Sequence, residues 1–284
     1  MSDLRRMEET IFRALMILST LIILSVLVII LLTIVIRGLP AMNWSMITQV
    51  PKGGFYLGKE GGILNAIAGS LVLAGGSTFL AIIVSIPIVL YLNIYANRHS
   101  WLTAWARFSM DVLWGIPSIV YGAFGFTLML LLGLRASLLA GIITVSLFIL
   151  PIMSRAMDEV IRMMLTELLE ASYSLGATRL ETALKVVVRQ ALPGIITAVL
   201  IAFGRGIGDA ASVIFTAGFT DNLPSSLFRP VATLPLAIFF QLGTPFPEVQ
   251  GRAYASAFIL TIIILLISII SRILTHRVTK HVIK

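Results

Sequence analysis

The sequence predicts an all-α, polytopic membrane protein with about six transmembrane helices. Hydrophobic residues make up 58% of the 284 positions, and charged residues only 12%. Several uncharged runs approach or exceed the ~20 residues that cross a ~30 Å hydrocarbon core as a helix. A polar insertion at 155–190 separates two of these runs. The composition therefore excludes an ordinary soluble domain and favours one membrane domain, 1–284.

The first uncharged run follows Arg5, Arg6 and Arg13 and resembles a signal peptide, but it is too long and lacks a small-x-small cleavage site. We therefore expect an uncleaved first span. Pro117 predicts a kink in the third. The proline-rich stretch 218–252 predicts an irregular outer segment with one short helix around 236–241. We expect the spans at 14–36, 66–92, 112–134, 137–154, 191–217 and 253–271.

The basic residues orient these spans. Fourteen of the 21 Lys and Arg residues fall on the face shared by the two termini, six fall on the other face, and Arg205 lies within a span. Basic residues collect on the cytosolic side of membrane proteins. We therefore expect cytosolic termini and a cytosolic segment 155–190. The same rule explains the net charge of +8 and the pI near 10.2. We therefore expect no nucleic acid partner, although such a charge would suggest one in a soluble protein.

The segment 155–190 has the pattern of two helices with a bend between them. Good helix formers run from Glu167 to Leu175, and Gly176 stands where a helix stop needs positive φ. Thr178 and Glu181 have capping-box spacing. Leu180, Leu184 and Val187 follow at the spacing of one helix face. From the residues alone, an ordinary connection lying on the lipid headgroups is as good an interpretation as a docking element.

Two charges interrupt the fifth predicted span. Arg205 and Asp209 are four residues apart, so on a helix they share a face. One interpretation is a mutual ion pair that makes insertion of both charges tolerable. The other is an anion path, in which the guanidinium fork of Arg205 meets oxyanion oxygens and Asp209 holds it in position.

Several motifs resemble a known family. The loop signature of ABC-importer permeases is similar to Glu170, Ala171, Ser172 and Gly176, with Ser172 in place of the second Ala. Arg189 stands where many relatives have proline, which resembles the phosphate-specific branch. The stretch from Gly204 to Ala211 resembles the A-type motif of that branch, with Asp209 for Glu and Ala211 for Pro. Together with glycine-rich motifs at 61–71 and 115–122, the resemblance covers about residues 60–270.

The resemblance implies a permease subunit that carries inorganic phosphate across the cytoplasmic membrane. Segment 155–190 would then be a cytoplasmic coupling-helix loop held in a groove of an ATPase. The implied partners are a second related permease, two ATP-binding subunits, an extracytoplasmic phosphate-binding protein and membrane lipid. Another oxyanion such as molybdate, tungstate or sulfate remains open, as does a non-transporting membrane sensor.

No residue pattern indicates an enzyme. The run from Gly53 to Glu60 approaches a phosphate-binding loop, but it ends in Glu60 where Mg²⁺ coordination requires Ser or Thr. The chain has no cysteine, and its three histidines lack neighbours at metal-ligand spacing. We expect no catalytic residues, metal or cofactor, and we expect ATP hydrolysis on a separate polypeptide.

Overall fold

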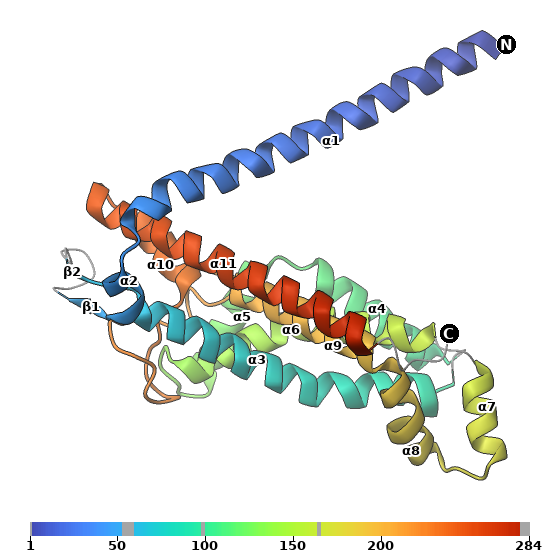
Figure 1. Cartoon of the computed structure of the whole chain (residues 1–284). Helices are drawn as coiled ribbons and strands as arrows, with labels where there is room; N and C mark the ends of the chain where they lie inside the picture. Colours follow the sequence, from blue (N-terminus) through green and yellow to red (C-terminus); the bar gives the residue numbers. More distant parts are fainter. Residues whose placement is uncertain (1, 53–59, 98–99, 164–165, 279–284) are drawn as a thin grey trace.

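The computed structural model describes residues 2–52, 60–97, 100–163 and 166–278 (Figure 1). The all-α prediction is confirmed, because the strands among these residues are a single antiparallel pair, β1 (Pro51–Lys52) and β2 (Glu60–Gly61). In the described part of the chain, five helices are long and apolar enough to cross a membrane, and there are six such spans if one bent pair of helices counts as a single span. The loop-like run at 53–59 lies outside the described residues.

The long helices, in chain order, are α1 (Ser2–Gly38), α3 (Leu64–Leu90), α6 (Leu138–Arg162), α9 (Val188–Ile207) and α11 (Pro247–Val278). The shorter α-helices are α2 (Trp44–Thr48), α4 (Trp101–Gly115), α5 (Ser118–Leu131), α7 (Thr166–Ser174), α8 (Arg179–Glu181) and α10 (Leu234–Leu242). A 3₁₀ turn, η1 (Leu39–Ala41), follows α1, and π-helical turns, η2 (Tyr91–Tyr95) and η3 (Thr182–Val187), follow α3 and α8.

The core is built around α6, which packs against α3, α9, α5 and α4. Its Val145, Ile149 and Met153 are fully buried. Small residues allow the close approach of neighbouring helices, because a side chain at Gly125 of α5 would collide with Thr144 of α6. A second cluster of buried hydrophobic side chains joins α2, the start of α3, α10 and α11.

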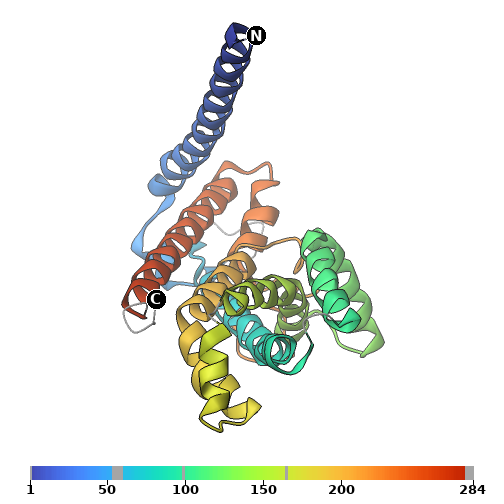
Figure 2. The same cartoon turned by 90° about the vertical axis from the view of Figure 1, so that its right-hand side faces the viewer.

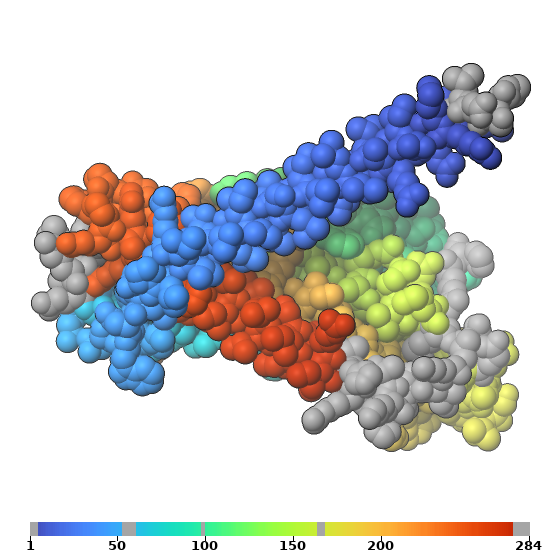
Figure 3. All heavy atoms as spheres, turned by 45° about the horizontal axis from the view of Figure 1, so that its top comes forward, coloured from blue at the N-terminus to red at the C-terminus, as the bar shows by residue number. Residues whose placement is uncertain are grey.

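Helix α1 stands apart from this core (Figures 1 and 2). None of its most apolar window is buried, and its blue atoms project past the rest of the chain in the space-filling view (Figure 3). Its last turn is tied to α11, since Arg37 Nη1 donates to the Tyr254 hydroxyl at 3.0 Å. An apolar helix left uncovered in this way requires lipid or another protein around it.

The helices refine the predicted spans. A break at Ile116 and Pro117 splits 112–134, and α4 and α5 meet there at 102°. Proline has no backbone N–H, so the helix loses a hydrogen bond at this point. Helix α6 continues past 154 to Arg162, and α9 ends at Ile207 rather than running to 217. The short helix expected around 236–241 is present as α10.

The start of α1 and the end of α11 lie at the end of the molecule that carries α7 and α8, and α2, α10 and the small sheet lie at the opposite end (Figure 1). An even number of spans places the termini on one side of a membrane. The arrangement therefore fits six crossings in which α4 and α5 together form one broken span.

Candidate functional site

Arg205 and Asp209 lie where α9 ends. The helix stops at Ile207, and the chain continues through Gly208 into a non-helical stretch that reaches 217. The expectation that both charges share one helix face is therefore wrong. The mutual ion pair, which was one of the two interpretations, is also missing from the salt bridges of the described residues. Two glycines, Gly206 and Gly208, weaken helix propensity at this point, which explains the early end.

The guanidinium of Arg205 faces an aromatic ring in place of the expected carboxylate. Its central carbon lies 5.3 Å from the centroid of Phe148 on α6, within the range of a cation–π contact. Arg205 is exposed, whereas Phe148 is buried. The cation also stands in the last turn of α9, where the helix dipole favours positive charge. The donors of Arg205 are thus open to an anion.

Asp209 has a local role. Its Oδ2 accepts a hydrogen bond from the Ser212 backbone N–H at 2.7 Å, which fixes the turn after α9. The neighbours of Asp209 in the chain, Gly208 and Ala210, line an open apolar groove of about 570 Å³ between α9, α10 and α11. Non-helical backbone at membrane depth is tolerated where it is buried in protein or lines a cavity, and this stretch meets that condition.

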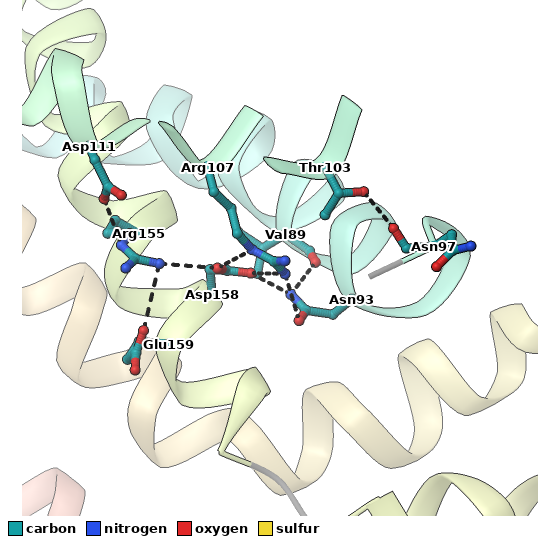
Figure 4. Close-up of polar contacts among 9 residues, drawn as sticks. All are labelled: Val89, Asn93, Asn97, Thr103, Arg107, Asp111, Arg155, Asp158 and Glu159. Carbon is teal, nitrogen blue, oxygen red and sulfur yellow. Dashed lines mark hydrogen bonds and ion pairs between the residues drawn. The ribbon is translucent and has the colours of Figure 1, made fainter. Parts of the chain in front are cut away.

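A buried polar centre lies further along α6, beyond Phe148 (Figure 4). Asp158 of α6 is fully buried, and its two carboxylate oxygens accept hydrogen bonds from Arg107 of α4 at 2.9 and 3.1 Å. Asn93 of η2 donates to the same carboxylate at 2.7 Å. One buried anion thus joins α3, through its π-helical extension, to α4 and α6. Such a charge is stable only when it is paired and hydrogen-bonded in this way.

Arg155 extends this centre toward solvent. It contacts Asp158 at 3.4 Å and pairs with Asp111 of α4 at 2.8 Å and with Glu159 at 3.6 Å. This centre is not predictable from local patterns, because Asp158 falls in the predicted polar segment 155–190, where an acidic residue is unremarkable. One signal in the sequence could have indicated it. Asn93 directly follows the predicted span 66–92 and Arg107 shortly precedes the span 112–134, so both polar side chains are expected at the same membrane face as Asp158.

Within segment 155–190, the structure has the predicted order of a helix, a bend at a glycine and a second helix. Gly176 has φ of +81° and no atom within 4 Å of a side chain placed there, so the backbone conformation alone demands glycine. The capping box is present, with the Thr178 hydroxyl accepting from the Glu181 N–H and the Glu181 carboxylate accepting from the Thr178 N–H. Glu170 and Ala171 are exposed on α7.

Ser172 is the buried member of this group. Its hydroxyl lies 2.9 Å from that of Thr182 in η3 and holds α7 against the following turn. The expectation of one face for Leu180, Leu184 and Val187 is wrong, since the first two are exposed and Val187 is buried. The π-helical turn between them changes the residues per turn and thus rotates the later side chain inward.

The capping carboxylate remains charged over the whole physiological range. The hydrogen bond from the Thr178 backbone, followed by that from Lys185, lowers the pKa of Glu181 to about 2. Because a lowered pKa stabilises the folded form above the usual carboxyl pKa, the cap is intact at neutral pH and is lost only as the pH falls toward 2.

The two sets of predicted residues lie far apart. The coupling residues lie before the start of α9, around α7 and α8, and Arg205 and Asp209 lie at the C-terminal end of α9. The 20 residues of α9 span about 30 Å. Any effect of one set on the other is therefore carried by helices. No cluster of metal-ligating side chains is found among the residues that the structure describes.

Comparison with known proteins places these features in a family. Residues 85–284 match the family described as binding-protein-dependent transport system inner membrane component. The phosphate transport system permease protein PstA of Yersinia pestis is 32% identical over 247 residues, which cover 87% of this chain and 82% of that protein. The PstA 1 protein of Mycobacterium tuberculosis H37Rv is 33% identical over 224 residues, covering 78% and 72%.

The fold has a solved counterpart. An inward-facing structure of the MetNI methionine ABC transporter aligns with a TM-score of 0.63 at 19% identity, over 76% of this chain and 96% of the other. At that identity the likeness concerns the fold alone. The family match and the two relatives carry the assignment: this chain belongs to the inner membrane components of binding-protein-dependent transport systems, as a multi-pass permease subunit of the PstA type.

Proposed function

We propose that this permease conducts inorganic phosphate inward through an ATP-driven importer. The observation that carries the proposal is Arg205, an exposed guanidinium without a carboxylate partner among the described residues, at the broken end of α9. A guanidinium fork matches the oxygens of phosphate. The names of the relatives add support, since both describe phosphate transport.

Arg205 and Asp209 take separate roles in this proposal. Arg205 contacts the passing anion, and because it has no ion pair to break, its donors need no rearrangement. Asp209 holds the turn after α9 through Ser212 and keeps the backbone of the path in one conformation. A conducting site must also release its ion, and a single exposed cation beside an aromatic ring binds an anion more weakly than a closed cage of donors does.

The segment from α7 to η3 is the proposed ATPase coupling element. Leu175 and Leu180 are exposed beside Glu170 and Ala171, and Gly176 fixes the bend between the helices. An exposed apolar surface on a rigid bent segment suits a helix-in-groove contact with a second protein. ATP hydrolysis would occur on two ATP-binding subunits, which pull or release this element.

The remaining proposed partners are a second related permease and an extracytoplasmic phosphate-binding protein. Gly204 stands on α9 with no atom within 4 Å of a side chain placed there, so the face beside Arg205 is open for another helix. The uncovered α1 offers further surface to the second permease or to lipid. The proline-rich segment 218–252 would receive the binding protein at the outer end. In this orientation both termini are cytosolic.

The test uses the complete importer in proteoliposomes, with the binding protein outside and ATP on the side of the coupling segment. We expect ATP-dependent accumulation of labelled phosphate that excess unlabelled phosphate suppresses and that sulfate, molybdate and tungstate leave unchanged. Accumulation of one of those other oxyanions in place of phosphate would assign a different substrate. If an assembled complex shows no ATP-dependent uptake of any of these anions, the transport proposal fails and the alternative of a non-transporting sensor is favoured.

A further inference from the structure

The contact between Arg205 and Phe148 is the end of a longer aromatic arrangement. The ring of Tyr121 on α5 meets the ring of Phe148 edge to face, with centroids 5.6 Å apart and an interplanar angle of 62°. Both rings are buried, whereas the guanidinium at the end of the row is exposed. Phe148 therefore stands between two elements that arrive from different parts of the chain, α5 and the end of α9.

Tyr121 is fixed in turn by the break between α4 and α5. Its hydroxyl donates to the backbone carbonyl of Leu113 at 2.8 Å. In an unbroken helix that carbonyl would accept from residue 117, but Pro117 has no N–H. The Leu113 carbonyl accepts instead from the Ile116 N–H, at 3.2 Å, and from the Tyr121 hydroxyl. The second bond fixes the orientation of the Tyr121 ring relative to both helices.

The same part of α5 touches the chain just after Arg205. A side chain at Gly122 would come within 2.7 Å of the Ala211 carbonyl oxygen and 3.0 Å of that of Ser212. The turn that contains Asp209 is therefore packed against α5 at the residue next to Tyr121. A shift of α5 would move the aromatic support and the turn together.

We propose that Phe148 and Tyr121 are positioning residues that hold the Arg205 guanidinium for the transported oxyanion. A ring face orients the cation without occupying its N–H donors in the way that a carboxylate does. The cation–π attraction is also weak enough that the guanidinium can turn toward an anion at little cost in free energy. This inference rests on the proposed transport role of Arg205.

The test changes the ring charge of Phe148 and leaves its shape almost unaltered. Phenylalanines with one, two and three ring fluorines, placed at 148 in the complete importer, weaken the attraction of the ring for a cation step by step. We expect the maximal phosphate uptake rate to fall with each fluorine, to a total of roughly two- to tenfold. The KM for the loaded binding protein and the assembly of the complex should stay unchanged, since neither depends on the ring quadrupole.

The matched control is Phe126 on α5, whose ring packs against Phe215 at 6.2 Å and has no cation contact among the described residues. Fluorination there should leave uptake unchanged. A second variant, Tyr121→Phe, keeps the ring but removes the bond to Leu113, and it should lower the maximal uptake rate without changing the KM for the binding protein.

Two outcomes would overturn the inference, and they are distinguishable. If Arg205→Ala abolishes uptake but the fluorine series at 148 is flat, or equals the series at 126, then Arg205 acts in transport without this support. If Arg205→Ala transports phosphate at the normal rate, the proposed role of Arg205 fails and the positioning role fails with it.

Discussion

At the scale of single residues, Asp158 is the side chain on which the most contacts converge. It is fully buried and receives Arg107 from α4, Asn93 from η2 and Arg155 from its own helix. Asp158→Asn removes the charge and leaves Arg107 without its counter-ion in a largely buried place. We expect a loss of roughly 3–5 kcal/mol in the free energy of unfolding. Denaturant titration of the purified permease in detergent micelles measures it.

Asp111→Asn is the control for that substitution. Asp111 pairs with Arg155, which also contacts Asp158, but its side chain is 49% exposed. Exposed ion pairs contribute about 1 kcal/mol at most. Equal losses for the two variants would contradict the account of Asp158 as the anchor of α4.

Arg205 and Asp209 show how far residue-level reasoning reaches. Their presence within an apolar run was enough to single them out, because the cost of burying a charge is a property of the residue itself. The prediction that they share one helix face was wrong, because it required α9 to continue past Ile207. Phe148, the actual neighbour of Arg205, lies 57 positions away in the sequence, and no local pattern connects the two.

At the scale of elements, Gly176 determines the bend between α7 and α8. Gly176→Ala places a side chain on a backbone with φ of +81°, at a cost of roughly 1–2 kcal/mol to the bent form. We expect fewer phosphate ions transported per ATP hydrolysed, with normal insertion into the membrane. Simultaneous measurement of uptake and hydrolysis in proteoliposomes gives this ratio.

Gly75→Ala in α3 is the matched substitution, since that glycine is helical and likewise has no atom within 4 Å. It should leave the ratio of uptake to hydrolysis unaltered. A normal ratio for Gly176→Ala would argue that the bend has no part in coupling.

Elements set by local chemistry were predictable, and those set by packing were not. The capping box of Thr178 and Glu181 and the bend at Gly176 follow from neighbouring residues, so the sequence reveals them. The π-helical turn η3 and the 102° angle between α4 and α5 depend on what these segments pack against. Pro117 marked the position of the break but not its size.

At the scale of the whole molecule, the orientation in the membrane is the main prediction. The chain has no cysteine, so single introduced cysteines report their side without interference. Leu175 is 88% exposed at the end that carries the termini, and Phe228 is 67% exposed in the segment that bonds to the start of α6. In sealed right-side-out vesicles, a membrane-impermeant maleimide should label Phe228→Cys but label Leu175→Cys only after permeabilisation. The reverse pattern would invert the topology and place the coupling segment away from ATP.

The central claim is that an unpaired guanidinium at the end of α9 meets the transported phosphate. Measurement of ATP-dependent phosphate uptake by the assembled importer carrying Arg205→Ala tests it most directly, with Arg13→Ala on the exposed face of α1 as the control. Loss of charge-assisted hydrogen bonds to the anion predicts a fall of at least about tenfold for Arg205→Ala and none for Arg13→Ala. Uptake at the normal rate by an assembled Arg205→Ala complex would contradict the account.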